Sequence, residues 1–284
     1  MNLKRGIIHL LCSAATVLYF CDPAWTQLKP YPQPEDKCRS VGKGVEYCLL
    51  EIKPETGRAA GRVHVLRIDP NFVKLKLLLA SEHDKQSRTA ASWCKDFGLI
   101  AAINAGMYGK DFLTNVGYLQ NGTYIQNKRW SRGYKSVLAF DTRKAEIPQA
   151  IVIDLDEPEA MKKVQDYNVV VQNLRLIKGD GINVWEKSEK KWSEAAVGMD
   201  RLGRILFLFC RSPYPMAEFN EIIKSSGLAV MKLMHMEGGP VASMSVRTKN
   251  LNMDISGSYE TGMKQDDTNE RQWPIPNVIG VQIK

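Results

Sequence analysis

A histidine and a glutamate follow an apolar run in the C-terminal part of the chain, within the sequence AVMKLMHMEGG. If this run is a β-strand, the alternation of side chains places His235 and Glu237 on the same face. Gly238 and Gly239 come next, and two glycines allow a sharp turn that brings backbone amides close to a bound group. The pattern predicts a site for acid–base chemistry or for binding an anion. A plain turn beside a core histidine explains the same residues equally well.

A second group of polar residues ends another apolar run, in the sequence AAINAGMYGKD at residues 101–111. Asn104 can donate to and accept from a hydroxyl or carbonyl group of a ligand. Tyr108 offers a flat ring on which a sugar can stack, and Asp111 lies just beyond it. A turn with a core tyrosine is the alternative interpretation, so neither segment identifies a function alone.

Both groups must be positioned by strands, because apolar and β-branched residues dominate the sequence around them. Strands are predicted at residues 45–53, 62–69, 73–80, 98–104, 136–141, 150–155, 169–177, 195–200, 204–210, 229–236 and 276–284. Helices are predicted at 90–97, 158–166 and 216–227, with Ser87 or Thr89 capping the first. The pair Asn121-Gly122 predicts a β-hairpin. Many strands and few helices, without strict alternation, predict an α+β fold: a single domain with a mixed, mostly antiparallel β-sheet core and a few packed helices.

Composition and charge argue against several classes of partner. The net charge is +8 over 284 residues, but the lysines and arginines are scattered and no basic run carries interleaved aromatic residues. We therefore predict no nucleic-acid partner. The chain has no CxxC pair, and His64, His83 and His235 are its only histidines beyond the N-terminal segment. No metal site and no cofactor are predicted, and the sequence gives no indication of the oligomeric state.

The N-terminal segment has the layout of a secretory signal peptide. Lys4 and Arg5 precede an apolar stretch that is too short and too weakly flanked for a membrane span. A lipid anchor on Cys21 is the alternative, and Phe20 immediately before it argues against that. We predict a signal peptide at 1–24, a proline-rich linker at 25–44 and the folded domain at 45–284. The expected location is secreted or periplasmic, with no stable membrane span after signal removal.

The cysteines fit an exported protein. Cys38 and Cys48 are close enough in sequence to bridge a short loop with a disulfide. Cys94 and Cys210 lie in apolar segments and are predicted to be plain core residues.

Four segments, in this order, resemble the phosphodiester glycosidase family, which includes the lysosomal-pathway "uncovering" enzyme and many exported bacterial proteins. They are AAINAGMY, NVGYLQNG, AAVGMDRLGRILFLF and LMHMEGGPVASM. The family has Asn-Ala-Gly-Met-Tyr, or a close variant, after a strand, which Asn104 to Tyr108 match. It later has a strand that ends in Leu-Asp-Gly-Gly, which Met236 to Gly239 match. The likeness runs from about Val45 to the last strand.

The resemblance implies hydrolysis of a sugar joined through its anomeric carbon to a phosphodiester, with N-acetylglucosamine among the candidate sugars. Glu237 would be the base or charge stabiliser, and His235 would orient it or carry a proton. The expected sugar or phosphate contacts are Asn104, Tyr108, Asp111, Arg211, Gly238 and Gly239. A second carboxylate is not singled out, and Asp111, Asp141 and Asp200 are all candidates.

Two departures from the family pattern matter. Glu237 stands where the family usually has Asp, and Glu194 stands where it often has Arg. The second change removes a natural partner for an anion, which Arg211 or Arg175 would have to replace. The alternative function is therefore a non-catalytic glycan-binding module on the same scaffold.

Overall fold

The structure is a computed structural model, and it describes residues 38–284. The predicted signal peptide and residues 25–37 of the predicted linker lie outside the described residues. Strand β1 (Cys38–Gly42) falls inside the predicted linker and pairs with β2 (Val45–Ile52). A disulfide joins Cys38 to Cys48, which are direct partners in this ladder. The sheet thus begins at Cys38, before the predicted domain boundary, and the predicted disulfide is confirmed.

Every strand pair among the described residues is antiparallel, so the predicted mixed core is corrected to three antiparallel sheets. The predicted α+β class holds only loosely, because the fold is mostly β. The largest sheet has the order β1-β2-β3-β14-β13-β15-β11-β12. Its further strands are β3 (Gly61–Ile68), β11 (Arg175–Lys178), β12 (Ile182–Asn183), β13 (Lys191–Asp200), β14 (Ile205–Pro215) and β15 (Val230–Gly238).

The other two sheets have five strands each, in the orders β7-β6-β10-β8-β9 and β17-β16-β5-β18-β4. The first contains β6 (Leu119–Asn121), β7 (Tyr124–Asn127), β8 (Ser136–Thr142), β9 (Ala150–Asp154) and β10 (Tyr167–Asn173). The second contains β4 (Val73–Leu79), β5 (Ala101–Asn104), β16 (Ser243–Arg247), β17 (Asn252–Ser256) and β18 (Asn277–Ile283). The predicted hairpin is confirmed between β6 and β7, where Gly122 adopts a φ of 61°.

Three α-helices form where the sequence predicts them, α1 (Ala90–Phe97), α2 (Ala160–Gln165) and α3 (Met216–Ser225). The backbone N–H of Ser92 donates to Thr89 Oγ1 at 3.0 Å, so Thr89 rather than Ser87 is the cap of α1. Short 3₁₀ turns lie at η1 (Ala80–Glu82), η2 (Gly179–Gly181) and η3 (Gly239–Val241). Within residues 38–284, no helix is long and apolar enough to cross a bilayer.

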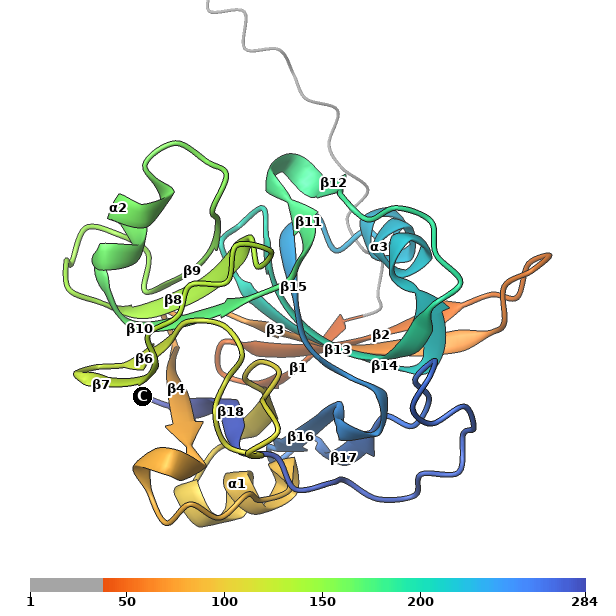
Figure 1. Cartoon of the computed structure of the whole chain (residues 1–284), viewed down its shortest axis with the longest axis horizontal. Coiled ribbons are helices and arrows are strands. Elements are labelled where there is room, and N and C mark those ends of the chain that lie inside the picture. Colours follow the sequence, from red (N-terminus) through yellow and green to blue (C-terminus); the bar gives the residue numbers. More distant parts are fainter. Residues whose placement is uncertain (1–37) are drawn as a thin grey trace, which may run out of the picture. The chain divides into compact units, whose positions relative to one another are not determined.

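A central hydrophobic core lies where the inner faces of the three sheets meet, with Phe207, Val171 and Ile103 among its members. Each sheet also packs an α-helix in a smaller cluster: α3 on the eight-stranded sheet, α1 on β5 and β18, and α2 on β8 to β10. Figure 1 shows these helices over three different parts of the β structure. Cys94 and Cys210 are buried and free, which confirms their predicted place in the core. This arrangement brings the ends of β15 and β5 together.

Candidate active site

The end of β15 contains a β-bulge that changes where its side chains point. His235 is opposite Ala196 of β13, and Glu237 is opposite Ala195, so one extra residue, Met236, has been inserted between them. Neighbouring residues of β13 face opposite sides of the sheet. The prediction that His235 and Glu237 share one face is therefore wrong. A bulge depends on pairing with a distant strand and cannot be read from the alternation alone.

The two polar segments singled out in the sequence are joined by Asn104. Its Nδ2 donates to the carbonyl of Val241 at 3.0 Å, and the N–H of Ser243 donates to its Oδ1 at 2.8 Å. The side chain is 1% exposed. Asn104 thus ties the end of β5 to the turn that follows Gly238-Gly239. Its direct contact with a ligand stays a prediction.

His235 and Glu194 form a buried pair across β15 and β13. The Nδ1 of His235 lies 2.8 and 2.9 Å from the two carboxylate oxygens of Glu194, and the indole Nε1 of Trp192 donates to the same carboxylate at 2.6 Å. Glu194 is 1% exposed and His235 is 4% exposed. The predicted partner of His235 was Glu237, but the hydrogen bond goes to Glu194. The charge at position 194 is therefore balanced inside the site.

The electrostatics of this pair follow from burial and from neighbouring carboxylates. Desolvation raises the pKa of Glu194, against the stabilising charge and hydrogen bonds of His235 and Trp192. Burial lowers the pKa of His235, but attraction to Glu194, Glu237 and Glu260 outweighs it, so the net pKa is raised. His235 therefore keeps its proton to higher pH than an exposed histidine.

Glu237 carries the most distinctive chemistry of the site. Burial raises its pKa to about 7, opposed by His235 and by the N–H of Gly238, and supported by the charges of Glu260 and Glu194. That N–H donates to Glu237 Oε1 at 3.1 Å, so the Gly238 amide, predicted to contact substrate, already holds the catalytic candidate. Within the described part of the chain, no other group donates to this carboxylate. It can exchange protons near neutral pH.

Two tyrosines lie within electrostatic reach of Glu237. Burial raises the pKa of Tyr108 to about 12, and the charge of Glu237 adds to this effect. Burial and the same carboxylate also raise the pKa of Tyr134. Tyr108 follows β5 and Tyr134 lies between β7 and β8, so two separate segments reach the site. Both phenols stay protonated at neutral pH and can donate hydrogen bonds.

Gly239 and Glu260 are in close contact just after the end of β15. A Cβ added to Gly239 would lie 2.4 Å from Glu260 Oε2, and Gly239 has a φ of 63°. Gly257 also lies against Gly239, since a Cβ added to Gly257 would lie 2.1 Å from the carbonyl oxygen of Gly239. Burial raises the pKa of Glu260, against the attraction of His235. The absence of side chains at Gly239 and Gly257 thus allows the 256–260 segment to place the Glu260 carboxylate against the end of β15.

Asp111 and Arg211, two further predicted contacts, have structural partners. Asp111 Oδ1 accepts from the N–H groups of Leu113 and Thr114, which shapes an exposed turn. Arg211 donates to the carbonyls of Ser256 and Asn269 at 2.8 Å each, so it fixes the 256–269 segment. Their contact with a substrate stays a prediction.

The remaining candidates are also engaged elsewhere. Arg175 pairs with Asp154 and Asp156. Asp200 pairs with Arg204 at 2.7 Å in the turn after β13, and Asp141 adopts a φ of 59° at the end of β8. The carboxylates that the structure does bring to Glu237 are Glu260 and Glu194. In residues 38–284, no group of three or more His, Cys, Asp or Glu side chains is placed to hold a metal ion.

Sequence reasoning missed Glu260, Tyr134 and Trp192. Glu260 and Tyr134 lie in irregular segments, SYETGMK and SRGYKS, which have no periodicity to interpret. Trp192 precedes Glu194 by two residues on a strand, and that spacing was the one available signal that the two side chains share a face.

Comparisons with known proteins identify the class to which this fold and site belong. A sequence profile of the family described as "Phosphodiester glycosidase" matches residues 97–282. The match covers more than half of the chain, and the chain belongs to this family. Comparison with curated proteins gives no match.

Two solved structures are similar in fold. A hypothetical protein from Synechocystis superposes with a TM-score of 0.59 at 12% sequence identity. The alignment covers 87% of this chain and 63% of the Synechocystis chain. The zebrafish N-acetylglucosamine-1-phosphodiester alpha-N-acetylglucosaminidase catalytic domain, auto-inhibited by its pro-peptide, has the same score and identity, with coverages of 87% and 86%. This chain thus spans less than two thirds of the Synechocystis protein, and at such identity the likeness concerns the fold alone.

Proposed function

We propose that the chain is an exported glycosidase that hydrolyses the bond between the anomeric carbon of a sugar and a phosphodiester. The observation that carries the proposal is Glu237, a carboxylate with a pKa of about 7 at the end of β15. It has neutral phenols and the paired His235 beside it. Membership of the phosphodiester glycosidase family supports the reaction class. The name of the zebrafish relative makes N-acetylglucosamine the first sugar to test.

In this reaction Glu237 acts as the general base. Its ionised form takes a proton from water as the water oxygen bonds to the anomeric carbon, and the bond from that carbon to the phosphate oxygen breaks. The phosphate monoester leaves with the electron pair of that bond and is stable as an anion, so it needs little protonation. Glu260 supplies a second carboxylate that stabilises positive charge on the sugar ring. His235, held by Glu194 on the opposite face of β15, acts on the site through its electrostatic attraction to Glu237 and Glu260.

The segment that carries Tyr134 supplies cations for the phosphate in place of the missing family arginine. Lys128, Arg129 and Arg132 are exposed on it. Within the described residues, none of the three forms an ion pair. These exposed positive charges would attract a phosphodiester toward the segment that carries Tyr134. Tyr108 and Tyr134 then provide neutral donors at closer range.

Export is proposed on the predicted signal peptide and on the Cys38–Cys48 disulfide. Disulfides persist in oxidising compartments and are rare in the reducing cytosol. The expected location is secreted or periplasmic.

The test is sugar release from a panel of sugar 1-phosphodiesters, N-acetylglucosamine first, by the unaltered protein and by Glu237→Gln. Loss of a general base predicts a rate at least about 100-fold lower in the variant. Glu270→Gln, which changes an exposed carboxylate that is not among the groups acting on Glu237, should keep full activity. Saturable binding of the sugar 1-phosphodiesters without any product from folded protein would instead establish the non-catalytic binding module.

A further inference from the structure

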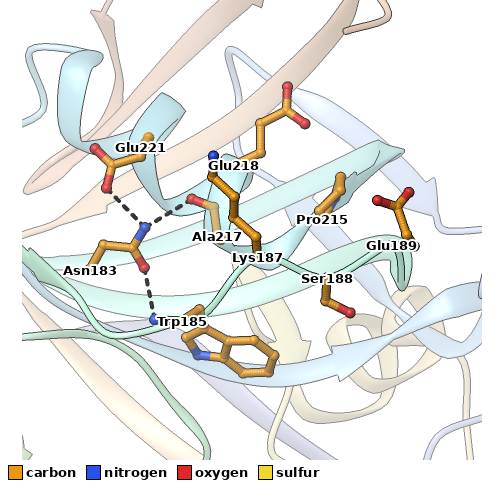
Figure 2. A pocket seen from close by; sticks show the side chains of 9 residues that line it. All are labelled: Asn183, Trp185, Lys187, Ser188, Glu189, Pro215, Ala217, Glu218 and Glu221. Carbon is orange, nitrogen blue, oxygen red and sulfur yellow. Dashed lines mark hydrogen bonds between the residues drawn. The ribbon is translucent and has the colours of Figure 1, made fainter. Parts of the chain in front are cut away.

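A pocket of about 730 Å³ lies between α3 and the segment that leads into β13. Figure 2 shows its lining, in which Asn183 and Lys187 reach toward the residues at the start of α3. The charged, amide and aromatic members are Asn183, Trp185, Lys187, Glu189, Glu218 and Glu221. None of them belongs to the cluster around Glu237. The volume is in the range of small-molecule sites, which is about 300–1,000 Å³.

The indole of Trp185 is held in place before any ligand arrives. Its Nε1 donates to the carbonyl of Arg175 at 2.7 Å, and its backbone N–H donates to Asn183 Oδ1 at 3.1 Å. Asn183 Nδ2 in turn donates to the carbonyl of Ala217 and to Glu221 Oε1, both at 2.9 Å. These bonds, drawn in part in Figure 2, join the ring to α3. A ring fixed in this way loses little entropy on binding.

The charges of the pocket select against an anionic ligand. Three carboxylates line it against one lysine. Hydrogen bonds from Asn183 and Lys224 lower the pKa of Glu221, so it is ionised. The Glu218 carboxylate has only a 3.9 Å contact with Arg58, and Glu189 has no partner among the described residues. Carboxylates accept hydrogen bonds from hydroxyl groups, and a fixed indole covers the apolar face of a sugar ring.

The pocket is joined to the site by a row of aromatic rings. The ring centroids of Trp185 and Trp192 are 6.0 Å apart, and those of Trp192 and His235 are also 6.0 Å apart. We propose that this pocket is a second carbohydrate site, which binds an uncharged sugar unit of a glycan. The proposal does not depend on hydrolysis, because binding here needs neither Glu237 nor a phosphate.

The test is equilibrium binding of neutral trisaccharides to the intact protein, measured by calorimetry and by tryptophan fluorescence. The probes are the N-acetylglucosamine, maltose-type and cellulose-type trimers, with the cationic glucosamine trimer and N-acetylglucosamine 1-phosphate as charged comparisons. At least one neutral trimer should bind saturably with little dependence on salt. Trp185→Ala should weaken that binding about tenfold or more, whereas Trp185→Phe, which keeps a ring, should weaken it less.

Controls separate this site from the one at Glu237. Glu237→Gln should bind the neutral trimer as the unaltered protein does, even if no substrate for hydrolysis is found. Trp185→Ala also removes core packing, so a second variant, Glu218→Ala, leaves the core intact. Glu218→Ala should weaken binding of the neutral trimer severalfold. Glu270→Ala is the control and should leave that binding unchanged. No saturable binding of any neutral trimer overturns the proposal. So does preferential binding of the cationic trimer, or binding that Trp185→Ala and Glu218→Ala leave unchanged.

Discussion

At the residue scale, the protonation of Glu237 should set the pH dependence of the reaction. As a general base it must be ionised, and its pKa is raised to about 7 by burial. The value of kcat/KM should therefore rise with pH through about 7 and level off above it. The measurement is the pH–rate profile on the best substrate of the panel. A rate that falls through the same interval would assign Glu237 the role of an acid instead.

The same raised pKa has a consequence for stability. Between pH 4.5, the ordinary pKa of a glutamate, and about 7, the unfolded chain loses the Glu237 proton while the folded protein retains it. Stability from this group is complete below pH 4.5 and is lost as the pH rises through 7. Glu237→Gln removes the loss. Relative to the unaltered protein, the unfolding free energy of Glu237→Gln should increase by about 2 kcal/mol between pH 4.5 and 8. This increase is smaller than the whole pKa shift implies, because the Glu237 side chain is partly exposed.

Urea unfolding at several pH values checks this, with Glu270→Gln as a control that should show no such trend. A difference between Glu237→Gln and the unaltered protein that is independent of pH would contradict the raised pKa.

Sequence reasoning singled out Glu237 and His235 as candidates because their types and their place before two glycines are local features. It did not predict the partner of Glu194, which the structure pairs with His235. The pairing of Glu194 with His235 depends on the register of β13 against β15 and on the bulge at Met236. Neither can be deduced from the spacing of residues within one strand.

At the element scale, the turn after β15 depends on Gly239 for two separate reasons. It has a φ of 63°, and an added Cβ would collide with Glu260. Gly203 has a φ of 78° but open space around it, which makes it a matched control. Gly203→Ala should cost about 1 kcal/mol from backbone strain alone. Gly239→Ala should cost about 1–3 kcal/mol more through crowding and should also lower kcat, because Glu260 must move.

Denaturant unfolding and steady-state kinetics of the two variants test this. Equal stability and unchanged turnover in both would show that the contact between Gly239 and Glu260 does not position the site.

The elements themselves were largely predictable where their signals are local. The turn at Asn121-Gly122, the cap at Thr89 and the apolar face of α3 all follow from residues within a few positions of one another. The antiparallel order of the sheets did not follow, since β5 pairs with β16 and β18 from the far end of the chain. Strand β1 was missed because its polar sequence carries no apolar alternation.

At the scale of the whole molecule, the disulfide fastens the first strand to the large sheet. Reducing the Cys38–Cys48 bond removes a cross-link with a sequence separation of 10 residues. The expected loss of stability is up to about 3 kcal/mol, and Tm should fall by several degrees in the presence of a reductant. Cys38→Ser should already have the lower Tm and should not respond further to reductant. A Tm that reductant leaves unchanged in the unaltered protein would show that the bond contributes nothing to stability.

The central claim is that water attacks the sugar carbon at Glu237, and hydrolysis in ¹⁸O-labelled water tests it most directly. A phosphodiester of N-acetylglucosamine is cleaved by the unaltered protein and by Glu237→Gln, and mass spectrometry locates the label in the products. We predict label in the released sugar and none in the phosphate monoester, with little product from the variant. Label in the phosphate, or equal turnover by Glu237→Gln, would contradict the proposed glycosidase and its base.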